Sequence, residues 1–462
     1  MTNDLLMTND PSSMTNSIHF IAIGGAAMHN LALALHSKGY NVTGSDDEIK
    51  EPSLSRLKAA GLLPEKEGWY PEKLETKPDA VILGMHARAD NPELIRAKEL
   101  GLKIYSFPEY FYEQSKDKIR VVIGGSHGKT TITSMIMYVL KACGKDFDYM
   151  VGSTVAGFDT MVKLTDKAPV IILEGDEYLS SPIDRRPKFH LYQAHIGLLS
   201  GIAWDHINVF PTFENYVAQF AKFAADLPAG GTLIYYQGDE ELRKIANQLS
   251  SEVKSTPYDA PEYFIKDGIS IVKIEGAEFP LQVFGKHNLT NLEGAREVCK
   301  LLGVGAKEFY AAAQSFSGAG RRMELVKQTT DKVIFRDFAH SPSKLKATVS
   351  AAKEQFPQRK IIACMELHTF SSLSENFLEQ YSGTMIEADL PVVYFNPETI
   401  AHKKLPPISV DQVKKAFDDD RISVFTNSTE LLKFISTNFN ANSVLLMMSS
   451  GTFDGIDFKG LI

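Results

Sequence analysis

The most constraining feature of this chain is a glycine-rich turn between an apolar stretch and a helical stretch, RVVIGGSHGKTT at residues 120–131. Apolar residues at 119 and 121–123 predict a buried strand, and the apolar positions of residues 132–140 repeat with helical spacing. Glycines let backbone N–H groups gather around anionic oxygens, and the helix that follows presents its positive end. The stretch therefore predicts a phosphate-binding loop inside an α/β domain.

Seven consecutive residues of this turn are the candidate nucleotide ligands: Gly125, Ser126, His127, Gly128, Lys129, Thr130 and Thr131. Lys129 is expected to contact the outer phosphates, and Thr130 to offer its hydroxyl to Mg²⁺. The spacing departs from the common phosphate-loop pattern, because Ile123 stands where that pattern has its first glycine. A tight turn that carries an accidental lysine is the alternative interpretation.

Length and composition limit the possible partners. A chain of 462 residues, 44% of them apolar, is long enough for about two or three domains. The formal net charge of −8 and the lack of basic runs argue against nucleic acid as a partner. The three cysteines are too few and too scattered for a disulfide framework. No stretch is apolar enough to span a membrane and no signal peptide is recognisable, so we expect a cytoplasmic protein with no membrane partner.

Alternating strand and helix patterns predict an α/β protein of three domains. A polar segment at residues 1–16, with a repeated MTND, is expected to be a disordered tail. The predicted domains are a Rossmann-like domain at 17–115, a P-loop ATPase-like domain at 116–320 and a second Rossmann-like domain at 321–462.

The first domain offers a second nucleotide site. Gly24 and Gly25 follow an apolar strand, and Asp46 comes about twenty positions later, as in dinucleotide-binding domains. A nicotinamide-dependent oxidoreductase is a remote alternative, because Ile23 and Met28 stand where the full fingerprint needs glycine.

Two polar residues follow predicted strands of the middle domain. Glu174 ends an apolar run, so we expect it at the carboxyl edge of a parallel sheet, where a carboxylate can complete a Mg²⁺ shell with Thr130. His206 follows another strand and could hold a second cation or the transferring phosphate. For His206 taken alone, a structural histidine is the alternative.

Three later segments add candidate nucleotide contacts. In GKHNLTN, the side-chain amides of Asn288 and Asn291 can pair with an adenine edge, and helix capping is the alternative for Asn288. Arg322 lies at a domain junction, where closure would bring its guanidinium onto the γ-phosphate. Asp337, which ends a strand shortly before His340, is placed to accept hydrogen bonds from ribose hydroxyls.

Taken together, these residues resemble the Mur ligase family, the ATP-dependent amide-forming enzymes of bacterial cell-wall precursor synthesis. The resemblance covers about residues 18–462 and rests on six motifs in order: GSHGKTT at 125–131, Glu174, Asp205-His206, HNLTN at 287–291, RRME at 321–324 and DFAH at 337–340. It implies ATP and Mg²⁺ as cofactors, with Thr130, Glu174 and His206 on the metal. The catalytic residues that it implies are Lys129, Glu174, His206 and Arg322.

The resemblance also implies the substrates. The start of the first domain is similar to the branch that acts on UDP-N-acetylmuramate, which implies binding of the UDP-sugar there and of the amine in the third domain. DEYLSSPIDRRPKFHLY at 176–192 and MSSGTFDGI at 448–456 resemble the member that attaches the recycled tripeptide L-Ala-γ-D-Glu-meso-diaminopimelate. ELHTFSSL at 366–373 is nearer the member that adds L-alanine, which is the alternative amine. A monomer or weak homodimer is expected.

Seven residues are expected to contact the substrates: Gly24, Gly25, Asp46, His86, Arg186, Lys188 and His368. Arg186 and Lys188 belong to a basic segment that could receive the carboxylates of the tripeptide, and a solvated basic turn is the alternative. Two positions depart from the family pattern. Phe220 stands where several members have a carbamylated lysine that bridges the metals, and Ser341 stands in place of a second histidine after His340.

Overall fold

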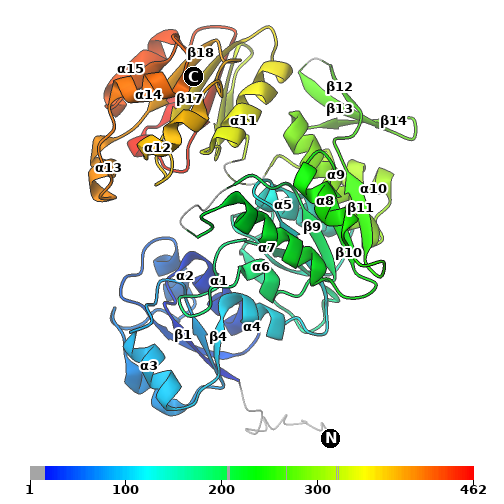
Figure 1. Ribbon diagram of the computed structural model, residues 1–462, viewed down its shortest axis with the longest axis vertical. Coiled ribbons are helices and arrows are strands. Elements are labelled where there is room, and N and C mark those ends of the chain that lie inside the picture. The colour runs from blue at the N-terminus through cyan, green and yellow to red at the C-terminus, as the bar shows by residue number, and fades with distance from the viewer. Residues whose placement is uncertain (1–15, 205–208, 267, 319, 321) are drawn as a thin grey trace, which may run out of the picture.

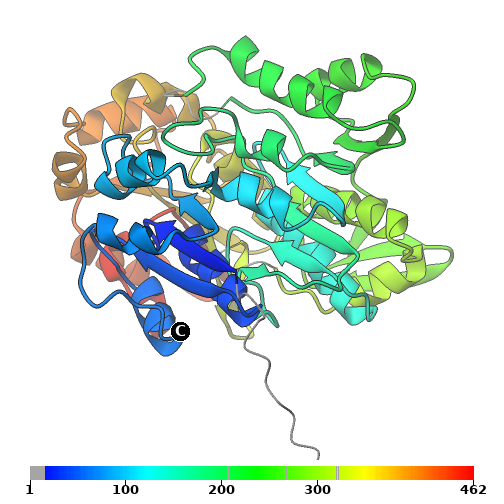
Figure 2. The same cartoon turned by 90° about the horizontal axis from the view of Figure 1, so that it is seen from below.

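The computed structural model describes residues 16–204, 209–266, 268–318, 320 and 322–462. Its described residues form four sheets, and in three of them most strands run parallel with helices on the faces (Figure 1). The chain passes from an N-terminal domain at the bottom of Figure 1 through a middle domain to a C-terminal domain at the top. Figure 2 shows the N-terminal sheet from below, in front of the C-terminal domain. The predicted α/β class with three domains is confirmed.

The N-terminal domain is built on a parallel sheet of order β2-β1-β3-β4. Its strands are β1 (Ser17–Ile21), β2 (Asn41–Ser45), β3 (Ala80–Leu83) and β4 (Ile104–Ser106). Its helices are α1 (Ala26–Ser37), α2 (Ser53–Ala59), α3 (Pro92–Glu99), α4 (Phe107–Glu113) and the short 3₁₀ helix η1 (Pro71–Thr76). The Gly24-Gly25 turn joins β1 to α1, so it lies at the carboxyl edge of this sheet, where parallel sheets bind ligands.

The middle domain has a seven-stranded sheet of order β11-β10-β9-β5-β8-β6-β7, parallel except for β7. Its strands are β5 (Ile119–Gly124), β6 (Asp148–Met150), β7 (Val162–Lys163), β8 (Val170–Glu174), β9 (Ile196–Leu199), β10 (Thr232–Tyr236) and β11 (Lys254–Tyr258). Its helices are α5 (Lys129–Ala142), α6 (Lys188–Leu191), α7 (Phe213–Ala225), α8 (Glu240–Asn247), α9 (Lys286–Leu301) and α10 (Ala306–Ala313). A small antiparallel sheet of β12 (Tyr263–Lys266), β13 (Ile269–Ile274) and β14 (Ala277–Leu281) precedes α9.

The C-terminal domain has a six-stranded sheet of order β15-β16-β20-β17-β18-β19, parallel except for β15. Its strands are β15 (Glu324–Gln328), β16 (Lys332–Asp337), β17 (Lys360–Glu366), β18 (Leu390–Tyr394), β19 (Ser423–Phe425) and β20 (Ser443–Met448). Its α-helices are α11 (Pro342–Gln355), α12 (Glu375–Leu378), α13 (Pro397–His402), α14 (Val410–Phe417) and α15 (Ser428–Asn438). The 3₁₀ helices η2 (Glu379–Tyr381), η3 (Phe453–Gly455) and η4 (Phe458–Leu461) complete it.

The central strands of the middle domain explain where the site forms. The residues VIIL of β8 and IGLL of β9 are almost entirely apolar, and both strands are buried between helical layers. β5 lies between them, so the turn after β5 opens at the carboxyl edge of the sheet beside the ends of β8 and β9. This edge is where a doubly covered parallel sheet exposes backbone and polar groups to a ligand.

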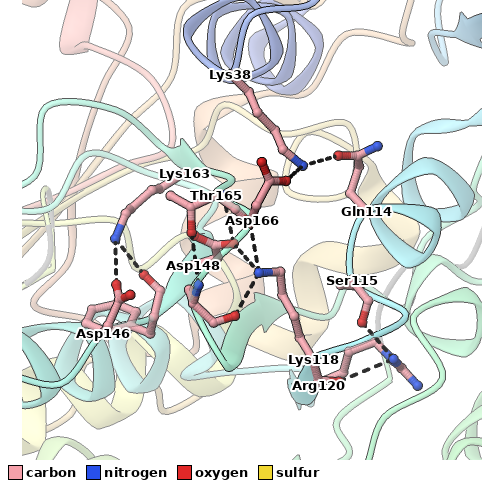
Figure 3. A network of polar contacts seen from close by, with 12 residues as sticks. Lys38, Gln114, Ser115, Lys118, Arg120, Asp146, Asp148, Lys163, Thr165 and Asp166 are labelled. Atoms are coloured by element: carbon pink, nitrogen blue, oxygen red, sulfur yellow. Dashed lines mark hydrogen bonds and ion pairs between the residues drawn. The ribbon is translucent and has the colours of Figure 1, made fainter. Parts of the chain in front are cut away.

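A polar network joins the N-terminal domain to the middle domain (Figure 3). Lys38, just after α1, pairs with Asp166 at 2.8 Å and donates to the side-chain carbonyl of Gln114 at 3.0 Å. Below it in Figure 3, the buried Lys118 pairs with the buried Asp148 at 3.1 Å. Because a buried charge needs a partner, this pair anchors the start of β5 on the middle domain.

Candidate active site between the middle and C-terminal domains

The phosphate loop has the geometry that its glycines predict. β5 ends at Gly124 and α5 begins at Lys129, with Gly125 at φ +127° and Gly128 at φ +78°. A Cβ atom on Gly125 would lie 2.8 Å from the backbone nitrogen of Ser200. A Cβ atom on Gly128 would collide with the side-chain oxygen of Asn291. Both glycines are therefore required by backbone conformation and by close neighbours.

Lys129 is held inside the loop by a carboxylate. Its Nζ donates to the carbonyl of Gly125 and to Glu177 Oε2, both at 2.7 Å. Burial lowers the pKa of Lys129, but the carboxylates of Glu177 and Asp176 outweigh burial, so the pKa is raised and the side chain stays a cation. Glu177 also accepts from the hydroxyl of Tyr216 at 3.0 Å, and that hydroxyl lies 2.9 Å from Ser126 Oγ on the loop.

Thr130 and Glu174 come together, as the strand-end position of Glu174 predicts. Thr130 Oγ1 donates to Glu174 Oε1 at 2.7 Å, and the backbone N–H of Gly152 donates to Glu174 Oε2 at 2.7 Å. Burial and the charge of Asp176 raise the pKa of Glu174. A hydroxyl and a carboxylate at this spacing are hard oxygen donors of the kind that Mg²⁺ takes, so these residues fit the ion.

The third predicted metal ligand, His206, lies outside the described residues. Among the residues that the structure does describe, no three histidine, cysteine, aspartate or glutamate side chains form a metal cluster. Mg²⁺ commonly keeps several waters and takes only one or two protein ligands, so the pair Thr130 and Glu174 is compatible with a magnesium site.

A pocket of about 420 Å³ opens beside the loop, between the middle and C-terminal domains. Seven of the predicted nucleotide contacts line it: His127, Gly128, Thr131, Asn288, Asn291, Arg322 and Asp337. They come from β5–α5, from α9 and from both sides of the domain junction. The structure therefore brings into one pocket residues that are up to about two hundred positions apart in the sequence.

Inside the pocket, Asn288 and Asp337 are engaged with backbone groups. Asn288 donates to the carbonyl of Phe284 at 3.0 Å, and the N-cap of α9 is Gly285, so Asn288 does not cap the helix. Asp337 accepts from the backbone N–H of Met323 at 2.6 Å and of Ala339 at 2.8 Å. The carboxylate thus fixes the junction that carries Arg322.

The Arg322 side chain packs on the aromatic ring of Phe338 at that junction. Its guanidinium lies 4.8 Å from the centre of the Phe338 ring, which is a cation–π contact. His340 does not line the pocket. Its Nδ1 lies 2.8 Å from the carbonyl of Phe338, and its own carbonyl accepts from the hydroxyl of Tyr381 at 2.6 Å.

Two serines that line the pocket, Ser200 and Ser343, belong to none of the sequence motifs described above. Ser200, directly after β9, donates to the carbonyls of Gly124 and His127 and so closes the phosphate loop from the side. Ser343, at the start of α11, lies 2.8 Å from His127 Nε2 and links the loop to the C-terminal domain. A serine after a buried apolar strand is the signal that could have identified Ser200.

Comparison with known proteins identifies the family. Three family models match in order: "Mur ligase family, catalytic domain" over residues 17–118, "Mur ligase middle domain" over 123–299 and "Mur ligase, glutamate ligase domain" over 321–451. The UDP-N-acetylmuramate–L-alanine ligase of Sulfurihydrogenibium sp. is 30% identical over 384 residues, which is 81% of this chain and 82% of that protein. This chain belongs to the Mur ligase family. It is therefore an ATP-dependent ligase that forms an amide bond.

Other relatives and solved structures agree with the whole architecture. The UDP-N-acetylmuramate–L-alanine ligase of Carboxydothermus hydrogenoformans is 26% identical, over 96% of each chain. The fold is similar to a murein peptide ligase from Psychrobacter arcticus, with a TM-score of 0.64 and 24% identity over 96% of this chain and 98% of that one. It is also similar to the UDP-N-acetylmuramate–alanine ligase of Thermotoga maritima, with a TM-score of 0.69 and 22% identity over 95% and 96%.

In this Mur ligase, the glycine turn of the N-terminal domain is supported by two buried side chains. Asp46 accepts from the backbone N–H of Gly24 at 2.7 Å, and burial raises the pKa of Asp46. His29 Nδ1 lies 2.9 Å from the carbonyl of Gly25. His86 is exposed in the segment after β3. Asp46 and His29 thus hold the turn in shape.

No helix among the described residues is long and apolar enough to cross a membrane.

The basic segment after β8 is largely neutralised by acidic neighbours. Arg186 pairs with Asp184 at 2.6 Å and with Glu109 of α4 at 3.1 Å. Lys188 pairs with Asp176 at 2.9 Å. If Arg186 and Lys188 contact the substrate as predicted, each must exchange a carboxylate of the protein for one of the substrate. For the exposed Arg186 the cost is modest, since exposed ion pairs contribute about 0–1 kcal/mol, whereas Lys188 is half-buried.

In the C-terminal domain, the segments 366–373 and 448–456 lie against each other. Glu366, at the end of β17, accepts from the hydroxyl of Ser449 and from the backbone N–H of Phe453, at 2.9 Å for the latter. His368 Nδ1 lies 3.7 Å from Glu366 Oε1, and a Cβ atom on Gly451 would lie 2.8 Å from the His368 ring. His368 is thus fixed at the carboxyl edge of the sheet, 35% exposed.

Proposed function

We propose that this protein joins the lactyl carboxylate of UDP-N-acetylmuramate to the amine of the tripeptide L-Ala-γ-D-Glu-meso-diaminopimelate, using ATP and Mg²⁺. The observation that carries the proposal is the pocket that unites the phosphate loop with Asn291 and Arg322 from other parts of the chain. The names of the two curated relatives support the sugar nucleotide, since each is a UDP-N-acetylmuramate–L-alanine ligase.

The residues of the pocket fit a reaction in two steps. The lactyl carboxylate attacks the γ-phosphorus of ATP, which forms an acyl phosphate and releases ADP. The amine then attacks the acyl carbon, loses a proton, and phosphate leaves. Lys129 and Arg322 supply positive charge where the phosphoryl group transfers, and such charge is worth most in a water-excluded site.

The metal has a place in this scheme. Thr130 and Glu174 would hold Mg²⁺, which would offset negative charge on the phosphates. The surrounding residues fix that place: Gly152 orients Glu174, and the helix α5 orients Thr130. Closing the C-terminal domain over the pocket would keep water from the acyl phosphate, since His127 already reaches Ser343 across the two domains.

Two amines compete in the proposal. The tripeptide is favoured by the 176–192 and 448–456 segments, which resemble the tripeptide-adding member. L-Alanine is the second candidate, favoured by the names of the curated relatives and by the 366–373 segment around His368.

A competition assay tests the proposal. Phosphate release is measured with ATP, UDP-N-acetylmuramate and either amine, followed by competition at equal concentrations, because specificity is a ratio of kcat/KM values. We expect release to require all three substrates and the tripeptide to win. Preference for alanine would make the chain an alanine-adding ligase, and no release with either amine would reject both candidates.

A further inference from the structure

The loop after β17 presents an exposed aromatic ring from a rigid turn. The backbone N–H of Thr369 donates to Ser372 Oγ at 2.9 Å, and the backbone N–H of Ser372 donates to Thr369 Oγ1 at 3.0 Å. Ser372 is fully buried, whereas Phe370, at the tip of the turn, is 60% exposed. The reciprocal hydrogen bonds therefore hold Phe370 outward, away from the hydrophobic core.

A lysine from the neighbouring strand connection covers this ring. Lys403 follows α13, which begins three residues after the end of β18, and its Nζ lies 4.4 Å from the centre of the Phe370 ring. Lys403 itself is half-buried. Among the described residues, no carboxylate lies within ion-pair distance of Lys403, whereas Arg186 has two such partners and Lys188 has one. Lys403 is thus a positioned cation that has kept its capacity to pair with an anion.

The pair lies on the ligand-binding edge of the C-terminal sheet. The register places the ends of four parallel strands at one level: Asp337 is opposite Met448, Met365 is also opposite Met448, and Glu366 is opposite Tyr394. Asp337 at this level lines the nucleotide pocket. The connections that carry Phe370 and Lys403 leave β17 and β18 at the same edge, on the lower side of the domain in Figure 1, toward the other two domains.

We propose that Phe370 and Lys403 recognise the distal, carboxylate-bearing end of the amine substrate. This inference rests on the proposed function and adds to it the residues that choose a peptide over a single amino acid. Lys403 would pair with a carboxylate of the diaminopimelate residue, and the Phe370 ring would pack on its aliphatic chain. A small amino acid that reacts at the same centre is too short to make both contacts.

A simpler role for each residue leaves part of the observation unexplained. A lysine at a helix C-terminus complements the helix dipole, but that role does not require an aromatic ring beneath it. An isolated exposed apolar side chain is ordinary on a protein surface, but here a turn closed by side-chain hydrogen bonds fixes its direction. The recognition of a flexible, charged ligand accounts for both features together.

Steady-state kinetics of Lys403→Met and Phe370→Ala test the inference, with Lys404→Met as matched control, since Lys404 is the adjacent exposed lysine. We expect KM for the tripeptide to rise about tenfold in Lys403→Met, which is the usual scale for one charge-assisted contact. KM for ATP and for UDP-N-acetylmuramate should stay within about twofold, and Lys404→Met should behave as wild type. Lys403→Arg should recover most of the loss, and melting temperatures confirm folding.

The outcomes separate the inference from the function on which it rests. A wild-type enzyme that uses the tripeptide, together with an unchanged tripeptide KM in Lys403→Met, overturns the inference and leaves the function standing. An increase in KM for ATP or the sugar nucleotide in place of the peptide would also overturn it, because it would assign the lysine to another substrate. A wild-type enzyme that rejects the tripeptide refutes both.

Discussion

Replacing Gly128 by alanine perturbs the phosphate loop at its most restricted point. Gly128 lies at φ +78° and immediately precedes α5, and its added Cβ would collide with the side-chain oxygen of Asn291. Two costs result. One is backbone strain, because an L-residue in the left-handed region costs about 1–2 kcal/mol. The other is displacement of Asn291 from the nucleotide pocket that it lines.

The two costs should appear in different measurements. Backbone strain raises the free energy of the folded state whether or not ATP is bound, so it lowers the melting temperature. Displacement of Asn291 would remove its proposed nucleotide contact, worth about 1 kcal/mol, and shift the N–H groups of the loop, so we expect KM for ATP to rise about tenfold, equivalent to about 1.4 kcal/mol. KM for UDP-N-acetylmuramate should change little, since its proposed site is in another domain.

Gly144 provides a matched control at the other end of the same helix. It has φ +64°, and a Cβ atom there would meet nothing within 4 Å. Gly144→Ala should therefore lower the melting temperature by a similar amount and leave KM for ATP unchanged. In a double-mutant cycle, Gly128→Ala should raise KM for ATP less in an Asn291→Ala background, because the collision is gone. Equal ATP kinetics in Gly128→Ala and Gly144→Ala, or strict additivity in the cycle, would refute this account.

Three further predictions concern the loop, the metal and pH. Lys129→Ala should abolish amide formation and leave UDP-sugar binding, measured by calorimetry, nearly intact; substantial remaining ligase activity would exclude the loop as the ATP site. Glu174→Gln and His206→Ala should each reduce turnover more at limiting than at excess Mg²⁺, and a loss independent of Mg²⁺ would argue against a ligand role. Burial lowers the pKa of His29 in the folded state below its unfolded value of 6.5. Above pH 6.5 the ring is neutral in both states, and the folded protein keeps its full stability. As the pH falls from 6.5 through the lowered pKa, the unfolded chain binds the proton more readily, so stability is lost. Between about pH 7 and pH 5, the melting temperature should therefore fall less in His29→Gln than in wild type or in His36→Gln, a change at an exposed histidine of the same helix.

The parts of the site that could be predicted are those encoded locally. The strand, turn and helix around Lys129 are contiguous, so their geometry follows from glycine positions and apolar periodicity. The contact of Glu174 with Thr130 needed one additional rule, that the carboxyl ends of neighbouring parallel strands meet at one edge. β5 and β8 are indeed neighbours in the sheet.

The parts that could not be predicted depend on contacts between distant segments. The basic residues around Arg186 predict either a receptor for carboxylates or a solvated turn, and nothing in that stretch indicates the contact with Glu109 of α4, 77 positions earlier. The contact of Asp337 with ribose hydroxyls stays a prediction, and its second role, accepting from backbone N–H groups at the domain junction, has no sign in the sequence. Composition and motif spacing do not indicate which charged side chains are already paired with other residues of the protein.

Position 220 shows how one replacement is accommodated by its surroundings. Phe220 is fully buried, with ring centres 5.5 Å from Phe189 and 5.1 Å from Tyr216. A lysine there would have to place a charge among aromatic rings, which burial disfavours unless a partner is present. In this chain the Phe220 ring instead packs on the ring of Tyr216. The hydroxyl of Tyr216 donates to Glu177, which also accepts from Lys129. Phe220 thus supports the phosphate loop from behind, through Tyr216, and its apolar ring offers no ligand to a cation.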